Sequence, residues 1–66
     1  MRLSKGKIYT IDNSDIVVKV LNIVYTDDTI IKAKCVIAHK SDGMIYEVKY
    51  LRLNKERISH WEVFNA

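Results

Sequence analysis

Proline is absent from this chain of 66 residues, and glycine occurs only twice, as Gly6 and Gly43. Without proline-rich, glycine-rich or repetitive stretches, the sequence shows no linker, no low-complexity tract and no boundary between two domains. A chain of this length has room for only one hydrophobic core. We therefore expect residues 1–66 to form a single domain.

Cysteine is represented by Cys35 alone, so a disulfide within the chain is excluded. Nothing close in sequence offers this thiol a base or metal ligands, and we expect it to be a small buried side chain. A lone thiol fits a reducing cytosol better than a secreted scaffold. No apolar run approaches the roughly 18 residues of a transmembrane helix, and residues 8–11 are too short for a signal-peptide core. These features favour a soluble, cytoplasmic protein without a membrane partner.

Catalytic motifs are missing as well. His39 and His60 are the only histidines, and no spacing of His, Cys, Asp and Glu matches a metal site. There is no glycine-rich phosphate loop. Asp27 and Asp28 fall in an expected turn, where aspartate serves the backbone. We therefore expect a protein that is not an enzyme, with no cofactor, no metal and no small-molecule substrate.

What the sequence does contain is alternation of apolar and polar residues over positions 30–53, which is typical of half-buried antiparallel strands. Asp42-Gly43 interrupts it and is a strong hairpin signal, because a type I′ turn needs positive φ at both central positions. The two inward rows would be Ile31, Ala33, Cys35 and Ile37 on the first strand, and Tyr46, Val48 and Tyr50 on the second.

Loop length decides the register of this hairpin. A two-residue loop at Asp42-Gly43 pairs Ile37 with Val48 and Cys35 with Tyr50, inward with inward. A three-residue loop would pair Ile37 with Glu47 and place a charge among apolar side chains. Because a slip of one residue turns every side chain to the other face, we predict the two-residue register. It puts Cys35 inside and Lys34 in water.

The flanking segments predict three more strands. Residues 8–11 and 16–25 form the first two, joined by a turn at 12–15, and a further turn at 26–29 leads into the hairpin. The apolar residues of the long second strand change parity near Val20-Leu21, which predicts a bulge or sharp bend there. Residues 54–57 allow one helical turn before a last strand at 58–64, with Ser59, Trp61 and Val63 on one face. A short helix stays open as the alternative there, because Ile58, Trp61 and Phe64 are spaced by three.

This order of elements resembles the SH3-like small barrels, a class that includes the Tudor and KOW domains. The resemblance covers nearly the whole chain and rests on the five strands, the bent second strand and the helical turn before the last strand. Residues 5–8 (Lys-Gly-Lys-Ile) are faintly similar to the start of a KOW motif. The resemblance implies an all-β fold, a five-stranded antiparallel SH3-like small barrel with a one-turn helical link before the last strand.

The first functional hypothesis rests on apolar residues expected on the outward face of the hairpin, more than a small monomer usually exposes. They are Ile30, Val36, Ile45 and Leu51. They favour a non-enzymatic interaction module that binds a protein partner or a second copy of itself. Formation of a homo-oligomer would also add buried apolar surface to the small core. A chain rich in Lys, Ile and Asn suits a small bacterial or phage regulator.

The alternative hypothesis is nucleic-acid binding. The net charge of +3 permits an anionic partner. A basic stripe is expected on the same outward face, made of Lys19, Lys32, Lys34, Lys49 and Arg52. Lysines there would bind phosphates, and tyrosines at the rim would stack on bases. Against this stands the ordinary role of lysine on the wet face of a strand, which is to keep the sheet soluble.

Overall fold

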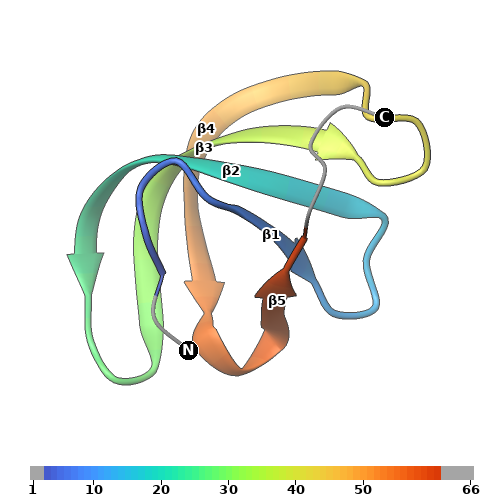
Figure 1. Cartoon of the computed structure of the whole chain (residues 1–66). Helices are drawn as coiled ribbons and strands as arrows, with labels where there is room; N and C mark the ends of the chain where they lie inside the picture. Colours follow the sequence, from blue (N-terminus) through green and yellow to red (C-terminus); the bar gives the residue numbers. More distant parts are fainter. Residues whose placement is uncertain (1–2, 62–66) are drawn as a thin grey trace.

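The computed structural model describes residues 3–61, which form five antiparallel strands in one sheet (Figure 1). The elements are β1 (Ile8–Ile11), β2 (Ile16–Thr26), β3 (Ile30–His39), β4 (Ile45–Asn54), the 3-10 turn η1 (Lys55–Arg57) and β5 (Ile58–His60). The all-β prediction and the one-turn link before the last strand are confirmed. Asn54 is the N-cap of η1, and its side-chain oxygen accepts a hydrogen bond from the Glu56 backbone N–H at 2.9 Å.

The sheet is curled but not closed. Its strand order is β4-β3-β2-β1-β5, so β4 and β5 are the two end strands. Within residues 3–61 no pairing joins these two strands, and the expected closure into a barrel is not seen. This leaves β4, a strand of ten residues, with one free edge.

Curvature comes from β2, which bends across the sheet (Figure 1). Its pairing with β3 shifts between Val20 and Asn22 and again between Ile23 and Tyr25. Each shift marks one extra residue in β2, which bends the strand and restores its apolar face. The bulge predicted near Val20-Leu21 is therefore confirmed, and the second shift was not foreseen.

The β3–β4 hairpin has a different loop from the predicted one. The His39 N–H donates to the Met44 oxygen at 3.0 Å, and the Gly43 N–H donates to the His39 oxygen at 2.8 Å, so the loop comprises residues 40–43. Gly43 has a φ of +73°, whereas Asp42 has no positive φ, which excludes a type I′ turn. Asp42 instead accepts the Met44 N–H at 2.9 Å through its carboxylate.

The register of the hairpin is consequently shifted, and the two-residue prediction is wrong. Ala38 pairs with Ile45, but Ile37 pairs with Glu47, so Tyr46 is an extra, bulged residue. The pairing rejected on sequence grounds is the one that forms. It is tolerated because β4 is an end strand, where Glu47 stays partly in water instead of being enclosed.

The core lies on one face of the curled sheet. On β3 the predicted inward row is confirmed: Ile31, Ala33, Cys35 and Ile37 are all buried. They pack with side chains from the other strands, namely Tyr9, Val18, Val20, Leu53 and Ile58. On β4 the predicted inward row is wrong, since Tyr46, Val48 and Tyr50 are exposed and Leu51 and Leu53 face the core instead. Burial raises the pKa of the Cys35 thiol to about 11.

The last strand is short. Ile58 is buried and pairs with Ile11, while Ser59 is exposed. The Trp61 N–H donates to the Ile8 oxygen at 3.1 Å and continues the ladder. The strand interpretation is thus confirmed up to His60, and Val63 and Phe64 lie outside the described residues.

Candidate functional site

The side of the β2–β4 sheet opposite the core carries three cross-strand rows of side chains. Residues directly opposite each other in an antiparallel sheet project to the same side. The rows, read from β2 through β3 to β4, are Lys19-Val36-Val48, Asn22-Lys34-Tyr50 and Tyr25-Lys32-Arg52. We refer to these nine residues as the cationic face.

Four of the five basic residues proposed from the sequence meet on this face: Lys19, Lys32, Lys34 and Arg52. Lys49 does not join them. It pairs with Cys35 and therefore lies on the core side of β4, where its Nζ is 3.5 Å from Glu47 Oε2. The error in the predicted hairpin register is the reason. A shift of β4 by one residue turns Lys49 to the core side and turns its neighbours Val48 and Tyr50 to the face.

No carboxylate of residues 3–61 lies within ion-pairing distance of the four basic side chains on the face. Lys32, Lys34 and Arg52 are exposed, and Lys19 is half-buried. The one acidic residue in the central part of β4, Glu47, pairs with Ile37 and lies on the core side. None of the nine residues of the face is acidic, and the Asp27 carboxylate stands only at its border, on the Tyr25 hydroxyl. The mild net charge of the whole chain conceals this grouping of basic side chains.

Two tyrosines belong to the same face. Tyr50 lies opposite Lys34 and is 62% exposed, and Tyr25 lies opposite Lys32 and is 49% exposed. The ammonium of Lys32 is 5.9 Å from the centroid of the Tyr25 ring, within cation–π range. Sequence reasoning placed Tyr50 in the core, and only the four-residue loop and the bulge at Tyr46 could have corrected this.

Tyr25 is oriented by the turn that follows β2. Its hydroxyl donates to Asp27 Oδ2 at 2.9 Å, while Asp27 Oδ1 accepts the backbone N–H groups of Thr29 and Ile30, both at 2.8 Å. The N–H groups of Ile30 and Thr29, followed by the Tyr25 hydroxyl, lower the pKa of the Asp27 carboxyl; the same hydrogen bond raises the pKa of Tyr25. Asp27 thus stabilises the turn through backbone N–H groups, as expected, and also orients the Tyr25 ring through its hydroxyl.

A shallow hollow extends the face at its Arg52 end. It has a volume of about 230 Å³ and is lined by Thr29, Ile30, Arg52 and Asn54. Ile30 pairs with Asn54, two residues beyond the pair of Lys32 and Arg52, so the hollow opens on the same side. Arg52 therefore belongs to both the face and the hollow.

The apolar residues proposed as a partner site do not form one patch. Val36 lies in the cationic face and Ile30 in the hollow, whereas Leu51 pairs with Ala33 and packs against the core. Ile45 is exposed near the tip of the hairpin. Five of the eight exposed large hydrophobic side chains in the described part of the chain lie instead along β4 and its loop, namely Met44, Ile45, Tyr46, Val48 and Tyr50.

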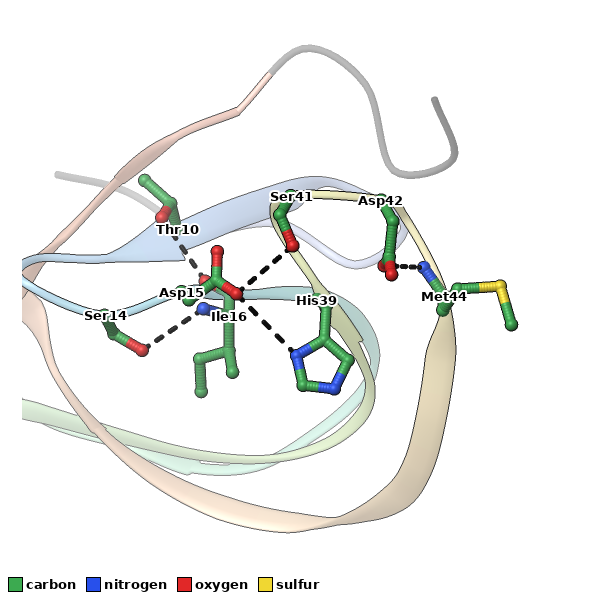
Figure 2. A network of polar contacts seen from close by, with 8 residues as sticks. All are labelled: Thr10, Ser14, Asp15, Ile16, His39, Ser41, Asp42 and Met44. Atoms are coloured by element: carbon green, nitrogen blue, oxygen red, sulfur yellow. Dashed lines mark hydrogen bonds and ion pairs between the residues drawn. The ribbon is translucent and has the colours of Figure 1, made fainter.

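A small polar cluster ties the hairpin tip to the turn before β2 (Figure 2). Asp15 accepts a hydrogen bond from the Ser41 hydroxyl at 3.4 Å, and its Oδ2 is 3.8 Å from His39 Nδ1. The His39 ring stacks on Tyr46 with centroids 4.6 Å apart. The Lys40 backbone N–H donates to the backbone carbonyl oxygen of Asp15 at 2.7 Å. These contacts hold the hairpin loop against the turn before β2, and Ser41 and His39 both reach the same carboxylate oxygen of Asp15.

Other candidate chemistry is equally sparse in the described part of the chain. Within residues 3–61 no three His, Cys, Asp or Glu side chains are grouped as metal ligands. His60 lies against the buried Tyr9 ring, with centroids 5.1 Å apart. None of the helical structure described is long and apolar enough to span a membrane.

Comparison of the chain with protein-family models, with curated proteins and with solved structures finds no match.

Proposed function

We propose that the chain binds single-stranded nucleic acid on the cationic face. The observation that carries the proposal is the convergence of four basic side chains and two exposed tyrosines on one side of three neighbouring strands. This is the alternative raised from the sequence, and the corrected register strengthens it. The shift moves Tyr50 from the expected core onto the side where Lys32 and Lys34 project, opposite Lys34.

Electrostatics supports an anionic ligand. Lysine and arginine side chains that neutralise phosphates release condensed counterions, and each such contact contributes about −0.7 to the salt slope of binding to single strands. Four contacts would give a slope of about −3. Because the described residues provide no carboxylate partner for these side chains, their charge is available to a ligand.

The tyrosines favour unpaired bases over a duplex. Adjacent strands are about 4.8 Å apart and successive rows about 7 Å apart, so Tyr25 and Tyr50 lie roughly 12 Å from each other. Lys32 and Lys34 stand between them. A single strand crossing the face obliquely would stack one base at each border, with its phosphates over the lysines, whereas a duplex keeps its bases stacked on one another.

Fluorescence anisotropy with labelled oligothymidylate at several salt concentrations tests the proposal. Arg52→Glu and Arg57→Glu form a matched pair, because each lowers the net charge by two, from +3 to +1. Arg52 lies on the face, and Arg57 lies in η1 beside the opposite edge of the sheet. We expect Arg52→Glu to weaken binding and reduce the salt slope by about 1, and Arg57→Glu to do neither.

Two results would contradict the proposal. One is the absence of binding by the folded wild-type protein at low salt. The other is equal binding to oligothymidylate and to a duplex of the same length, since stacking on Tyr25 and Tyr50 requires unpaired bases.

We also propose that the fold is an SH3-like small barrel in which the seam between β4 and β5 is unpaired. The strand order, the bent β2 and the turn η1 before β5 support this assignment. The same arrangement bears on function, because an unpaired seam leaves the edge of β4 free.

Protein binding along β4 is the second candidate function. It is favoured by the exposed hydrophobic side chains between Met44 and Tyr50. This keeps the first hypothesis from the sequence, but of its four residues only Ile45 belongs to the exposed set on β4.

A further inference from the structure

β4 has the properties of a strand that pairs with another chain. It is an end strand of an open sheet, ten residues long, and β3 is the only strand paired with it in the described part of the molecule. An edge of this kind presents a row of free backbone N–H and C=O groups to any strand of matching sequence.

Two devices that commonly block such an edge, proline and a run of like charges, are missing from the middle of β4. There is no proline in the chain. The two charged residues of the segment, Glu47 and Lys49, are of opposite sign and do not give the edge a net charge. Around them stand Val48, which is 50% exposed, and the exposed rings of Tyr46 and Tyr50. A bulge also disturbs edge pairing, but the one at Tyr46 stands at the start of the segment, so residues 47–53 form a regular edge that another strand can pair with.

We infer that β4 pairs antiparallel with β4 of a second copy of this chain. The two-fold axis passes midway between the two copies of Val48. The inference gives the second candidate function its partner and does not depend on nucleic-acid binding. In this register Val48 faces Val48 of the second copy, and Tyr50 faces its Tyr46. On the other side Glu47 faces Lys49 of the second copy, and Lys49 faces its Glu47.

Symmetry restricts the choice of register. A two-fold axis perpendicular to the sheet keeps each face of the sheet on its own side. One residue of β4 must then lie directly opposite its own copy, with the axis between the two. An axis one residue earlier would oppose two copies of Glu47, and one residue later would oppose two copies of Lys49. Like charges directly opposite each other destabilise a strand pair, and opposite charges stabilise it. Among these neighbouring registers, only the axis at Val48 places acid against base.

The bulge at Tyr46 sets one limit of the regular pairing, because the ladder with β3 is uninterrupted from Glu47 to Leu53. The regular pairing therefore comprises residues 47–49, and at each end the bulged Tyr46 of one copy lies opposite Tyr50 of the other. The same axis leaves both cationic faces on one side of the combined sheet, so dimerisation and nucleic-acid binding are compatible.

Sedimentation velocity over a range of protein concentrations tests the register through two single variants. Glu47→Lys and Lys49→Glu each turn two opposite-charge pairs into two like-charge pairs, and each should weaken the homodimer by about tenfold or more. Mixing the two variants should restore a dimer, since each basic chain then faces an acidic one. Within either chain the two charges still repel, so restoration on mixing can come only from contacts between copies.

Oxidative cross-linking provides a second test, in a Cys35→Ala background that removes the natural thiol. Val48→Cys places the two thiols opposite each other, with Cα atoms about 4.5–5.5 Å apart, which suits a disulfide. Tyr50→Cys is the matched control on the same face, because its thiols would be about 14 Å apart along the strand. We expect covalent dimer from the first variant and not from the second.

Either of two outcomes would overturn the inference. The wild-type protein could sediment as a monomer at every concentration. Alternatively, it could form a dimer that both charge variants leave unchanged and that Val48→Cys does not cross-link, which would place the contact elsewhere. Neither outcome affects the anisotropy experiment, so failure here is distinct from failure of nucleic-acid binding.

Discussion

β3 and β4 are the two strands of one hairpin, have equal length and show similar alternation in sequence, yet they differ sharply in burial. Five of the ten residues of β3 are buried, whereas Leu53 is the only buried residue of β4. The difference comes from position, because β3 lies between two strands and β4 has only one neighbour. Alternation therefore indicates which residues share a face, and the neighbouring strands decide whether that face is covered.

The largest expected contrast is between two identical truncations, one on each strand. Ile31 is 1% exposed and Ile45 is 53% exposed. Ile31→Ala should lower the free energy of unfolding by about 2–5 kcal/mol through lost burial and a cavity. Ile45→Ala should change it by about 0.5 kcal/mol or less. Urea denaturation at low protein concentration measures both, and similar losses would mean that β4 is packed as tightly as β3.

Burial on β3 should also appear in the pH dependence of stability. The pKa of Cys35 is raised from its ordinary 9.0 to about 11, because burial disfavours the thiolate. The unfolded chain therefore releases this proton first as pH rises. The stabilisation is complete below about pH 9 and is lost towards pH 11, by roughly 2–3 kcal/mol at about 1.4 kcal/mol per unit. Cys35→Ala isolates the effect from other titrating groups, and identical pH profiles for both proteins would refute it.

On β4 the exposed tyrosine should matter for binding and not for folding. Tyr50→Ala should weaken oligothymidylate binding by about 1–3 kcal/mol, the usual contribution of one stacked base. Tyr46→Ala is the control on the same strand, because its ring already stacks on His39 at 4.6 Å. Anisotropy titrations compare the two variants. A larger loss for Tyr46→Ala would move the binding surface to the hairpin tip.

The smallest effect is expected at the loop that sets the two strands against each other. Gly43 has a φ of +73°, a conformation that costs an L-residue roughly 1–2 kcal/mol. Gly43→Ala should reduce the free energy of unfolding by about that amount. Asp42→Ala gives a comparison in the same loop without positive φ. If Gly43→Ala proved neutral in urea denaturation, the loop conformation described above would be wrong.

Sequence alone predicted the inward row of β3 and the first of the two bulges in β2, and it failed at the edge strand. The row Ile31 to Ile37 and the bulge near Val20 followed from parity, because residues between two strands must keep apolar side chains on one face. β4 was misplaced because the preference for apolar pairs assumed that Glu47 would be enclosed. An end strand does not enclose it, and the loop of residues 40–43 with the bulge at Tyr46 carries no sequence signature as strong as Asp-Gly.

The error in the register of β4 also explains which residues of the candidate site were misplaced. Lys19, Lys32 and Lys34 were correctly placed on one face, since they belong to β2 and β3. Lys49 was assigned to the face and lies on the other side, while Tyr50 was assigned to the core and lies on the face. A shift of one residue in β4 accounts for both.

The ring signals of the four tyrosines in an NMR titration with oligothymidylate test the central claim most directly. Tyr9 is fully buried and serves as an internal reference, while Tyr46 reports on the hairpin tip. The account predicts that Tyr25 and Tyr50 shift upfield by stacking on bases and that Tyr9 does not move. Unchanged Tyr25 and Tyr50 signals in the presence of saturating oligonucleotide would contradict it.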